Sequence, residues 1–172
     1  TEDTAITSVP QESIRRLRIE VSNEGTVDAQ ATNFRLEYGT KVSTCANVGS
    51  WIDVGAVGGA WDMALSANIS DGNTTNVAAG ANGAVTDENS TFDGVGALRE
   101  TTSESGSITL TSSEFTELEY SIEATTESAF DTTYCFRVTD SGTALPVYDV
   151  YAELTTREKQ DFFIQRGVEV IT

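Results

Sequence analysis

Apolar and polar residues alternate along several short segments of this chain. Residues 16–22 read Arg-Leu-Arg-Ile-Glu-Val-Ser, and residues 33–39 read Asn-Phe-Arg-Leu-Glu-Tyr-Gly. In both segments every second side chain is apolar, and most of the side chains between them are charged or polar. A period of two is the pattern of a β-strand with one buried face. The sequence therefore predicts strands at 16–22 and 33–39.

The same pattern returns in the second half of the chain. A short strand is expected at 51–54, a hairpin turn at Asp140-Ser141-Gly142-Thr143, and further strands at 107–110, 118–124, 134–138 and 148–154. No segment has a convincing helical period. Several short strands without helices predict an all-β fold. Two antiparallel sheets would bury their apolar faces against each other in an Ig-like or jelly-roll-like β-sandwich.

The stretch between Gly55 and Gly106 has a different composition, rich in Gly, Ala, Asn, Ser and Thr. We interpret it as a loop-rich insertion with one or two short strands, one of them within 61–69. Such a stretch is either a functional loop or a surface elaboration with small edge strands, and we favour the second. The expected organisation is an N-terminal arm or short edge strand at 1–12, a sandwich at 13–156 that contains the insertion at 55–106, and a C-terminal strand at 157–172.

The chain is strongly acidic, with a formal net charge of −17 at pH 7. This charge repels nucleic acid and anionic membrane surfaces, so neither is an expected partner. Membrane insertion is not expected either, because no apolar run approaches the roughly 18 residues that span a bilayer. The chain starts with Thr1 rather than Met, and we interpret it as a mature secreted protein whose leader has been removed.

Cys45 and Cys135 are the two cysteines of the chain. A distant cysteine pair in an all-β chain predicts one structural disulfide and a location outside a reducing cytosol, at the cell surface or beyond it. In the strand at 134–138, Cys135 alternates with the apolar set and should face away from the core. The bridge would then pin a loop or an edge to the outside of a sheet.

Catalysis is not expected. The chain contains no histidine, which excludes Ser-His-Asp and Cys-His sites, and it has no Gly-x-Ser-x-Gly motif. No pair of carboxylates stands out for glycoside hydrolysis. The expectation is a protein without an enzymatic site and without a required cofactor.

Calcium is the one ion for which the sequence offers ligands. Oxygen-bearing side chains occur in Gly- and Asn-rich stretches at Asp71, Asn73, Asp87 and Asp93. These positions do not match an EF-hand loop, and ordinary Asp/Asn/Gly turns are the interpretation we favour.

Three triplets fit the acceptor pattern for N-linked glycans, at Asn68, Asn73 and Asn89. All three lie in the loop-rich stretch, where a glycan would project into solvent. They are glycosylation sites only in an organism that glycosylates its surface proteins.

Two segments resemble known families. Residues 19–29, Ile-Glu-Val-Ser-Asn-Glu-Gly-Thr-Val-Asp-Ala, are similar to the first hairpin of Ig-like bacterial and archaeal cell-surface domains, where a V-x-N-x-G turn precedes the next strand. Residues 131–138, Asp-Thr-Thr-Tyr-Cys-Phe-Arg-Val, with Ser-Gly-Thr-Ala-Leu at 141–145 and Tyr148, resemble a module repeated in large secreted or surface-anchored prokaryotic proteins. There a Ser/Thr-flanked cysteine, matched here by Cys45, accompanies the Tyr-Cys-Phe-Arg strand. The resemblance implies an extracellular β-sandwich and no chemistry.

The C-terminal segment alternates again after a charged link at 157–161. Its apolar residues are Phe162, Phe163, Ile164, Val168, Val170 and Ile171. This strand either folds onto its own sheet or completes a groove in a neighbouring copy, as donated strands do. The second option predicts a structural subunit of a prokaryotic extracellular filament or surface layer. The alternative function is a secreted carbohydrate-binding or adhesive module, with Trp51 and Trp61 as its platform if both are exposed on one face.

Overall fold

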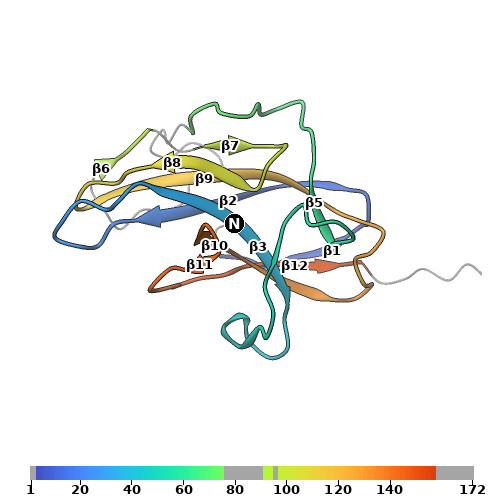
Figure 1. The fold of residues 1–172 in the computed structure, drawn as a ribbon. Helices are drawn as coiled ribbons and strands as arrows, with labels where there is room; N and C mark the ends of the chain where they lie inside the picture. Colours follow the sequence, from blue (N-terminus) through green and yellow to red (C-terminus); the bar gives the residue numbers. More distant parts are fainter. Residues whose placement is uncertain (1–2, 76–90, 95–96, 158–172) are drawn as a thin grey trace, which may run out of the picture.

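The computed structural model describes residues 3–75, 91–94 and 97–157. They form two β-sheets that pack face to face (Figure 1). Sheet A has the order β1 (Ile6–Val9), β12 (Ala152–Thr156), β10 (Thr133–Asp140), β3 (Thr32–Thr40) and β4 (Ile52–Asp53); β8 (Glu104–Ile108) also pairs with β3, and β11 (Thr143–Ala144) with β10. Sheet B has the order β2 (Ile14–Ser22), β9 (Glu114–Ala124) and β5 (Trp61–Met63); β6 (Thr91–Phe92) and β7 (Leu98–Arg99) also pair with β9. The all-β sandwich expected from the sequence is confirmed.

Two long antiparallel ladders organise the sandwich. β2 pairs with β9 over nine consecutive residue pairs, from Ile14–Glu123 to Ser22–Phe115. β3 pairs with β10 from Thr40–Tyr134 to Phe34–Asp140. In the immunoglobulin arrangement strands A, B, E and D form one sheet and C, F and G the other. Here β2, β9 and β5 take the places of B, E and D, while β3, β10 and β12 take those of C, F and G.

The alternating apolar faces meet between the sheets. Sheet A contributes Leu36 and Phe136, and sheet B contributes Leu118, Tyr120 and Ile122, all at most 1% exposed. These are the residues that the period of two placed inward. The strands predicted at 16–22, 33–39, 118–124 and 134–138 are therefore confirmed, and the structure extends them by a few residues at some ends.

Part of the N-terminal segment, residues 6–9, forms a strand of the sandwich. β1 runs parallel to β12 and forms an edge of sheet A. Val9 is fully buried in the core. The short edge strand, rather than the loose arm, is therefore the correct interpretation of this segment.

The strand predicted at 148–154 begins later than expected. β12 starts at Ala152, and Tyr148 lies before it. The Tyr148 hydroxyl donates to Val138 O and accepts from Leu145 N, at 2.8 Å each. Val150 is 56% exposed, so its place in the apolar alternation does not reflect burial. The alternation of apolar and polar residues thus begins at Tyr148, before the strand itself.

The loop-rich stretch contributes small strands along one side of β9. β5, β7 and β6 pair with successive parts of that strand. The strand expected within 61–69 ends at Met63, and β8 begins at Glu104 instead of residue 107. The described part of this stretch therefore adds short strands to both sheets.

Candidate functional site

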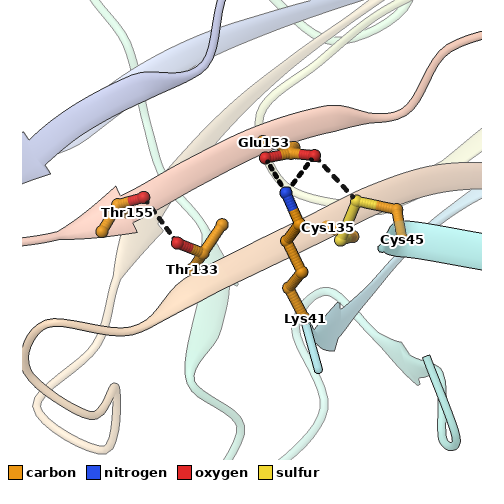
Figure 2. The surroundings of a disulfide bond; sticks show 6 residues. All are labelled: Lys41, Cys45, Thr133, Cys135, Glu153 and Thr155. Carbon is orange, nitrogen blue, oxygen red and sulfur yellow. Dashed lines mark hydrogen bonds and ion pairs between the residues drawn. A yellow bond between two sulfur atoms is a disulfide. The ribbon is translucent and has the colours of Figure 1, made fainter. Parts of the chain in front are cut away.

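The two cysteines form the disulfide that the sequence predicted (Figure 2). Cys45 begins a short 3-10 turn, η1 (Cys45–Asn47), and Cys135 lies on the outer face of β10. Gly39 is the residue opposite Cys135 in β3. A Cβ on Gly39 would lie 2.3 Å from Val48 Cγ1, so glycine allows the 45–51 loop to lie against the sheet. The bridge pins this loop to the outside of sheet A and does not cross the core.

Polar groups surround the bridge on the same outer face (Figure 2). Lys41 Nζ donates to both carboxylate oxygens of Glu153, at 2.7 and 2.8 Å. Glu153 lies opposite Cys135 in β12, and one of its oxygens is 3.3 Å from Cys45 Sγ. Two thiolates and this carboxylate would suit a metal ion, but the sulfurs are bonded to each other. The disulfide and the neighbouring Lys41–Glu153 ion pair are therefore a structural feature, in which neither sulfur is a free thiolate that could act as a ligand or nucleophile.

A buried carboxylate lies on the same outer face of sheet A as the disulfide. Glu37 of β3 is 4% exposed and accepts hydrogen bonds from Arg137 Nε and Nη2 at 3.0 and 2.8 Å. Thr139 Oγ1 donates to its other oxygen at 3.2 Å, and Arg35 lies 3.4 Å from that oxygen. This network satisfies a charge that burial would otherwise penalise heavily.

Aromatic rings cover this network. Trp51 stacks on Tyr151 with ring centroids 5.9 Å apart, and Tyr151 stacks on Tyr148 at 5.2 Å. The Arg137 guanidinium lies 4.2 Å from the centroid of Trp51. All three rings are partly exposed. The sequence singled out Trp51 but not the two tyrosines, which it assigned to a strand.

Trp61 is not part of this surface. It is fully buried and packs edge-on against Tyr134 and Phe136 in the core. A platform formed by Trp51 and Trp61 together is therefore excluded, because the two rings do not share an exposed face.

The outer face of sheet B holds a second set of buried charges. Glu117 and Glu119 of β9 are 0% and 2% exposed. Arg18 of β2 reaches both, at 2.5 and 2.6 Å, and Arg16 also contacts Glu119. Burial opposes the charged form of Arg18, but the hydrogen bonds and charges of the two glutamates outweigh it and raise the pKa of Arg18.

Three of the four calcium ligands suggested by the sequence lie among the described residues: Asp71, Asn73 and Asp93. Asp71 Oδ1 accepts from the Glu100 and Thr101 amides, at 2.6 and 3.3 Å, and its other oxygen binds the Thr101 hydroxyl. Partial burial opposes ionisation of Asp71, yet these hydrogen bonds and the charge of Arg99 hold its pKa below the usual range. Asn73 bonds through its backbone to Ser70 and Leu98. Asp93 lies at the end of β6, and Asp87 is outside the described residues. A calcium site stays a prediction.

Two of the three glycan acceptor positions can be located. Asn68 and Asn73 are exposed, and Asn89 lies outside the described residues. The hydroxyl of Thr75, which completes the Asn73 triplet, is buried and donates to Glu117 O at 2.8 Å. Asn68 is therefore the more accessible acceptor of the two in the folded chain.

A shallow hollow of about 490 Å³ lies beside the start of β10. Its lining is mostly polar and consists of Thr40, Lys41, Val42, Ser43, Asp131, Thr132 and Thr133. Lys41, one of the lining residues, donates from its amine to Glu153. No helix that the structure describes has the length and apolar character needed to cross a bilayer.

The assembly residues Phe162, Phe163, Ile164, Val168, Val170 and Ile171 lie outside the described residues. The described part contains another feature that bears on assembly, which the sequence did not single out. β1 pairs with β12, so the position beside β2 that strand A occupies in the immunoglobulin arrangement holds no strand within residues 3–75, 91–94 and 97–157. β2 is an edge strand with β9 as its ladder partner there.

Comparison of the chain with family models, with curated proteins and with solved structures finds no match. The disulfide is typical of an oxidising environment outside the cytoplasm.

Proposed function

We propose that this chain is a structural subunit of a prokaryotic extracellular filament or surface layer, whose copies join through β-strand contacts between subunits. The observation that carries the proposal is the edge of sheet B at β2. Along nine residues this strand pairs with β9, and on its other side no strand lies among the described residues. An edge of this length is a template for a strand from another chain.

The surfaces of the sandwich support a structural role. Both outer faces are occupied by buried ion pairs, around Glu37 on sheet A and around Glu119 on sheet B. The described hollow beside β10 is shallow and is lined mostly by residues with hydroxyl groups. The disulfide adds resistance to unfolding, as an exposed extracellular assembly requires. The expected partner is therefore another copy of the chain, and the proposal involves no enzymatic step, cofactor, nucleic acid or membrane insertion.

The C-terminal segment is the proposed end-to-end connector. A strand with Phe162, Ile164, Val168 and Val170 on one face would be an aggregation hazard if it stayed exposed. Seated on a neighbouring subunit, each such side chain would contribute about 1.5–3 kcal/mol. Repetition of a head-to-tail contact produces an open filament.

Electron microscopy and sedimentation of two variants test this proposal. Replacement of Phe162, Ile164, Val168 and Val170 by serine should abolish fibres or sheets. The matched control replaces Gln165 and Glu169, which lie among the alternating apolar positions in the sequence, by serine and should assemble like the unmodified chain. Assembly of the fourfold variant, or of a chain lacking residues 161–172, would show that the terminal segment is not the connector. Dispersed monomers of the unmodified chain at all concentrations would overturn the proposed function.

One observation favours a second function, carbohydrate binding or adhesion. Trp51, Tyr151 and Tyr148 form a partly exposed aromatic cluster on the outer face of sheet A. Aromatic rings are common contact surfaces for sugars and for other proteins. Because Trp61 is buried, a glycan that quenches tryptophan fluorescence would report on Trp51. A glycan array should then show binding that the Trp51→Ala variant loses, and no binding to any glycan would exclude the carbohydrate function.

A further inference from the structure

Three side chains that can bind a metal ion meet at the disulfide (Figure 2). The sulfurs of Cys45 and Cys135 and a carboxylate oxygen of Glu153 all lie within 4.8 Å of one another. They come from three separate elements, the η1 turn, β10 and β12. Thiolates and carboxylates are both zinc ligands, and three protein ligands with water in the fourth position form a known zinc arrangement. The fold therefore assembles a zinc ligand set whose two sulfurs are occupied only because they are bonded to each other.

The disulfide is the oxidised form of this pair of cysteines. In a reducing compartment, before the bridge has formed, both sulfurs are thiols. Cys135 is 0% exposed and Cys45 is 5% exposed. Thiolates with so little access to water are unfavourable alone, and a divalent cation compensates their charge. Binding of Zn²⁺ by two thiols releases one proton from each and leaves the oxidation state of sulfur unchanged.

Contacts other than the bridge hold the 45–51 loop in place. The loop packs on Gly39, where an added Cβ would lie 2.3 Å from Val48 Cγ1. At the end of the loop, Trp51 stacks on Tyr151. The Cα atoms of the two cysteines are 5.5 Å apart. Two thiolates on a tetrahedral zinc ion lie about 3.8 Å apart, given Zn–S bonds of about 2.3 Å, so small rotations of the cysteine side chains are enough to form the site.

Lys41 balances the charge of this ligand set. Its amine donates to both carboxylate oxygens of Glu153, at 2.8 Å to Oε1 and 2.7 Å to Oε2. Oε1 is also 3.3 Å from Cys45 Sγ. If Oε1 binds zinc, Lys41 retains Oε2, and a hydrogen bond of this kind orients a metal ligand. Two thiolates, one carboxylate, one ammonium and Zn²⁺ together carry no net charge.

We propose that the reduced form of this chain binds one zinc ion through Cys45, Cys135 and Glu153, with water in the fourth position. This inference is independent of the proposed function. The same place in the fold then holds the 45–51 loop in both redox states. The zinc ion holds it while the sulfurs are thiolates, and the disulfide holds it once they are bonded to each other.

Cobalt titration of the full chain tests the site. Co²⁺ substitutes for Zn²⁺ in tetrahedral sites, and it adds visible absorption bands and a near-ultraviolet band from bound thiolate. A phosphine reduces the bridge: water supplies the oxygen of the phosphine oxide and the protons of the two thiols. The reduced chain should bind one equivalent of Co²⁺ with both sets of bands, one equivalent of Zn²⁺ should remove them, and the oxidised chain should show neither. A reduced chain without the thiolate band would overturn the proposal.

Glu153→Gln distinguishes a three-ligand site from binding by the cysteines alone. Changing an outer partner of a metal ligand already costs about 10–100-fold in affinity, so loss of a ligand should weaken Zn²⁺ binding at least about tenfold. The matched control, Glu127→Gln, makes the same change at an exposed residue and should bind zinc like the unmodified chain. Equal affinity of both variants would mean that Glu153 is not a ligand and that the proposed site is wrong.

Thermal unfolding separates binding by the folded chain from binding by unfolded cysteines. An ion that binds only the folded state stabilises it, so Zn²⁺ should raise the unfolding temperature of the reduced chain and leave that of the oxidised chain unchanged. If reduction alone unfolds the chain, Zn²⁺ should restore its near-ultraviolet circular dichroism. Binding of Zn²⁺ with neither effect would place the ion on the unfolded chain and refute the site.

Discussion

Trp61 of β5 stands edge-on to Phe136 of β10, with ring centroids 5.0 Å apart and ring planes at 82°. This contact joins a short strand of the loop-rich stretch to the centre of the opposite sheet. Trp61 also packs against Tyr134, at 5.8 Å. The stretch between residues 55 and 106 is therefore not merely a surface addition, because it supplies the largest fully buried side chain of the described core.

Replacement of Trp61 by alanine should lower the free energy of unfolding by about 3–5 kcal/mol, because it removes a large buried side chain and leaves a cavity. Trp51→Ala is the control. It removes a partly exposed ring and a cation–π contact, and should cost only about 1 kcal/mol. Urea unfolding monitored by circular dichroism measures both. Equal losses would mean that Trp61 does not anchor the core.

Arg18→Met should destabilise the chain by about 3–5 kcal/mol, since it leaves the carboxylates of Glu117 and Glu119 buried with reduced compensation. Arg16→Met is the matched control, because the Arg16 side chain is 45% exposed and should matter less. Part of the loss should return when Glu117→Gln and Glu119→Gln are added to Arg18→Met. Thermal unfolding at constant pH measures the series, and an equal effect of both arginine variants would contradict the role assigned to Arg18.

Reduction of the disulfide should lower stability by about 4–5 kcal/mol in the chain-entropy model. The bridge closes a long loop, because its cysteines are 90 residues apart in the sequence. The Cys45→Ser and Cys135→Ser double variant should unfold at the same denaturant concentration as the reduced chain. Mass spectrometry of the unreduced, digested protein should show one linked peptide pair. Two free thiols would refute the bridge.

Acid should weaken the loop held by Asp71. Its pKa is lowered in the folded state, so its contribution to stability is present above the pKa of the unfolded chain and is lost as pH falls through the folded pKa. The unmodified chain should therefore be more stable than Asp71→Asn at neutral pH, and the difference should shrink in acid. Urea midpoints at a series of pH values measure this difference, with Asp140→Asn as an exposed control. A difference that is constant with pH would contradict the assigned hydrogen bonds.

The sequence alone was sufficient for the sandwich and for the inward faces of its long strands. Leu36, Tyr120 and Phe136 are buried where the alternation placed them. The outward direction of Cys135 also followed from the alternation. These predictions succeeded because side chains of a strand must point to opposite faces, whatever the rest of the chain does.

The tertiary structure alone decided how these elements are used. Trp61 and Trp51 look equivalent in the sequence, but only Trp61 reaches the core, because β5 pairs with β9 while the loop containing Trp51 is held outside sheet A by the disulfide. Glu117 and Glu119 lie on the outer face of β9, yet arginines of the neighbouring strand allow their burial. Among the described residues, β2 has β9 as its one neighbouring strand because β1 pairs with β12 in the other sheet. Strand order, burial of charge and open edges depend on contacts between residues far apart in the sequence, which a local pattern does not specify.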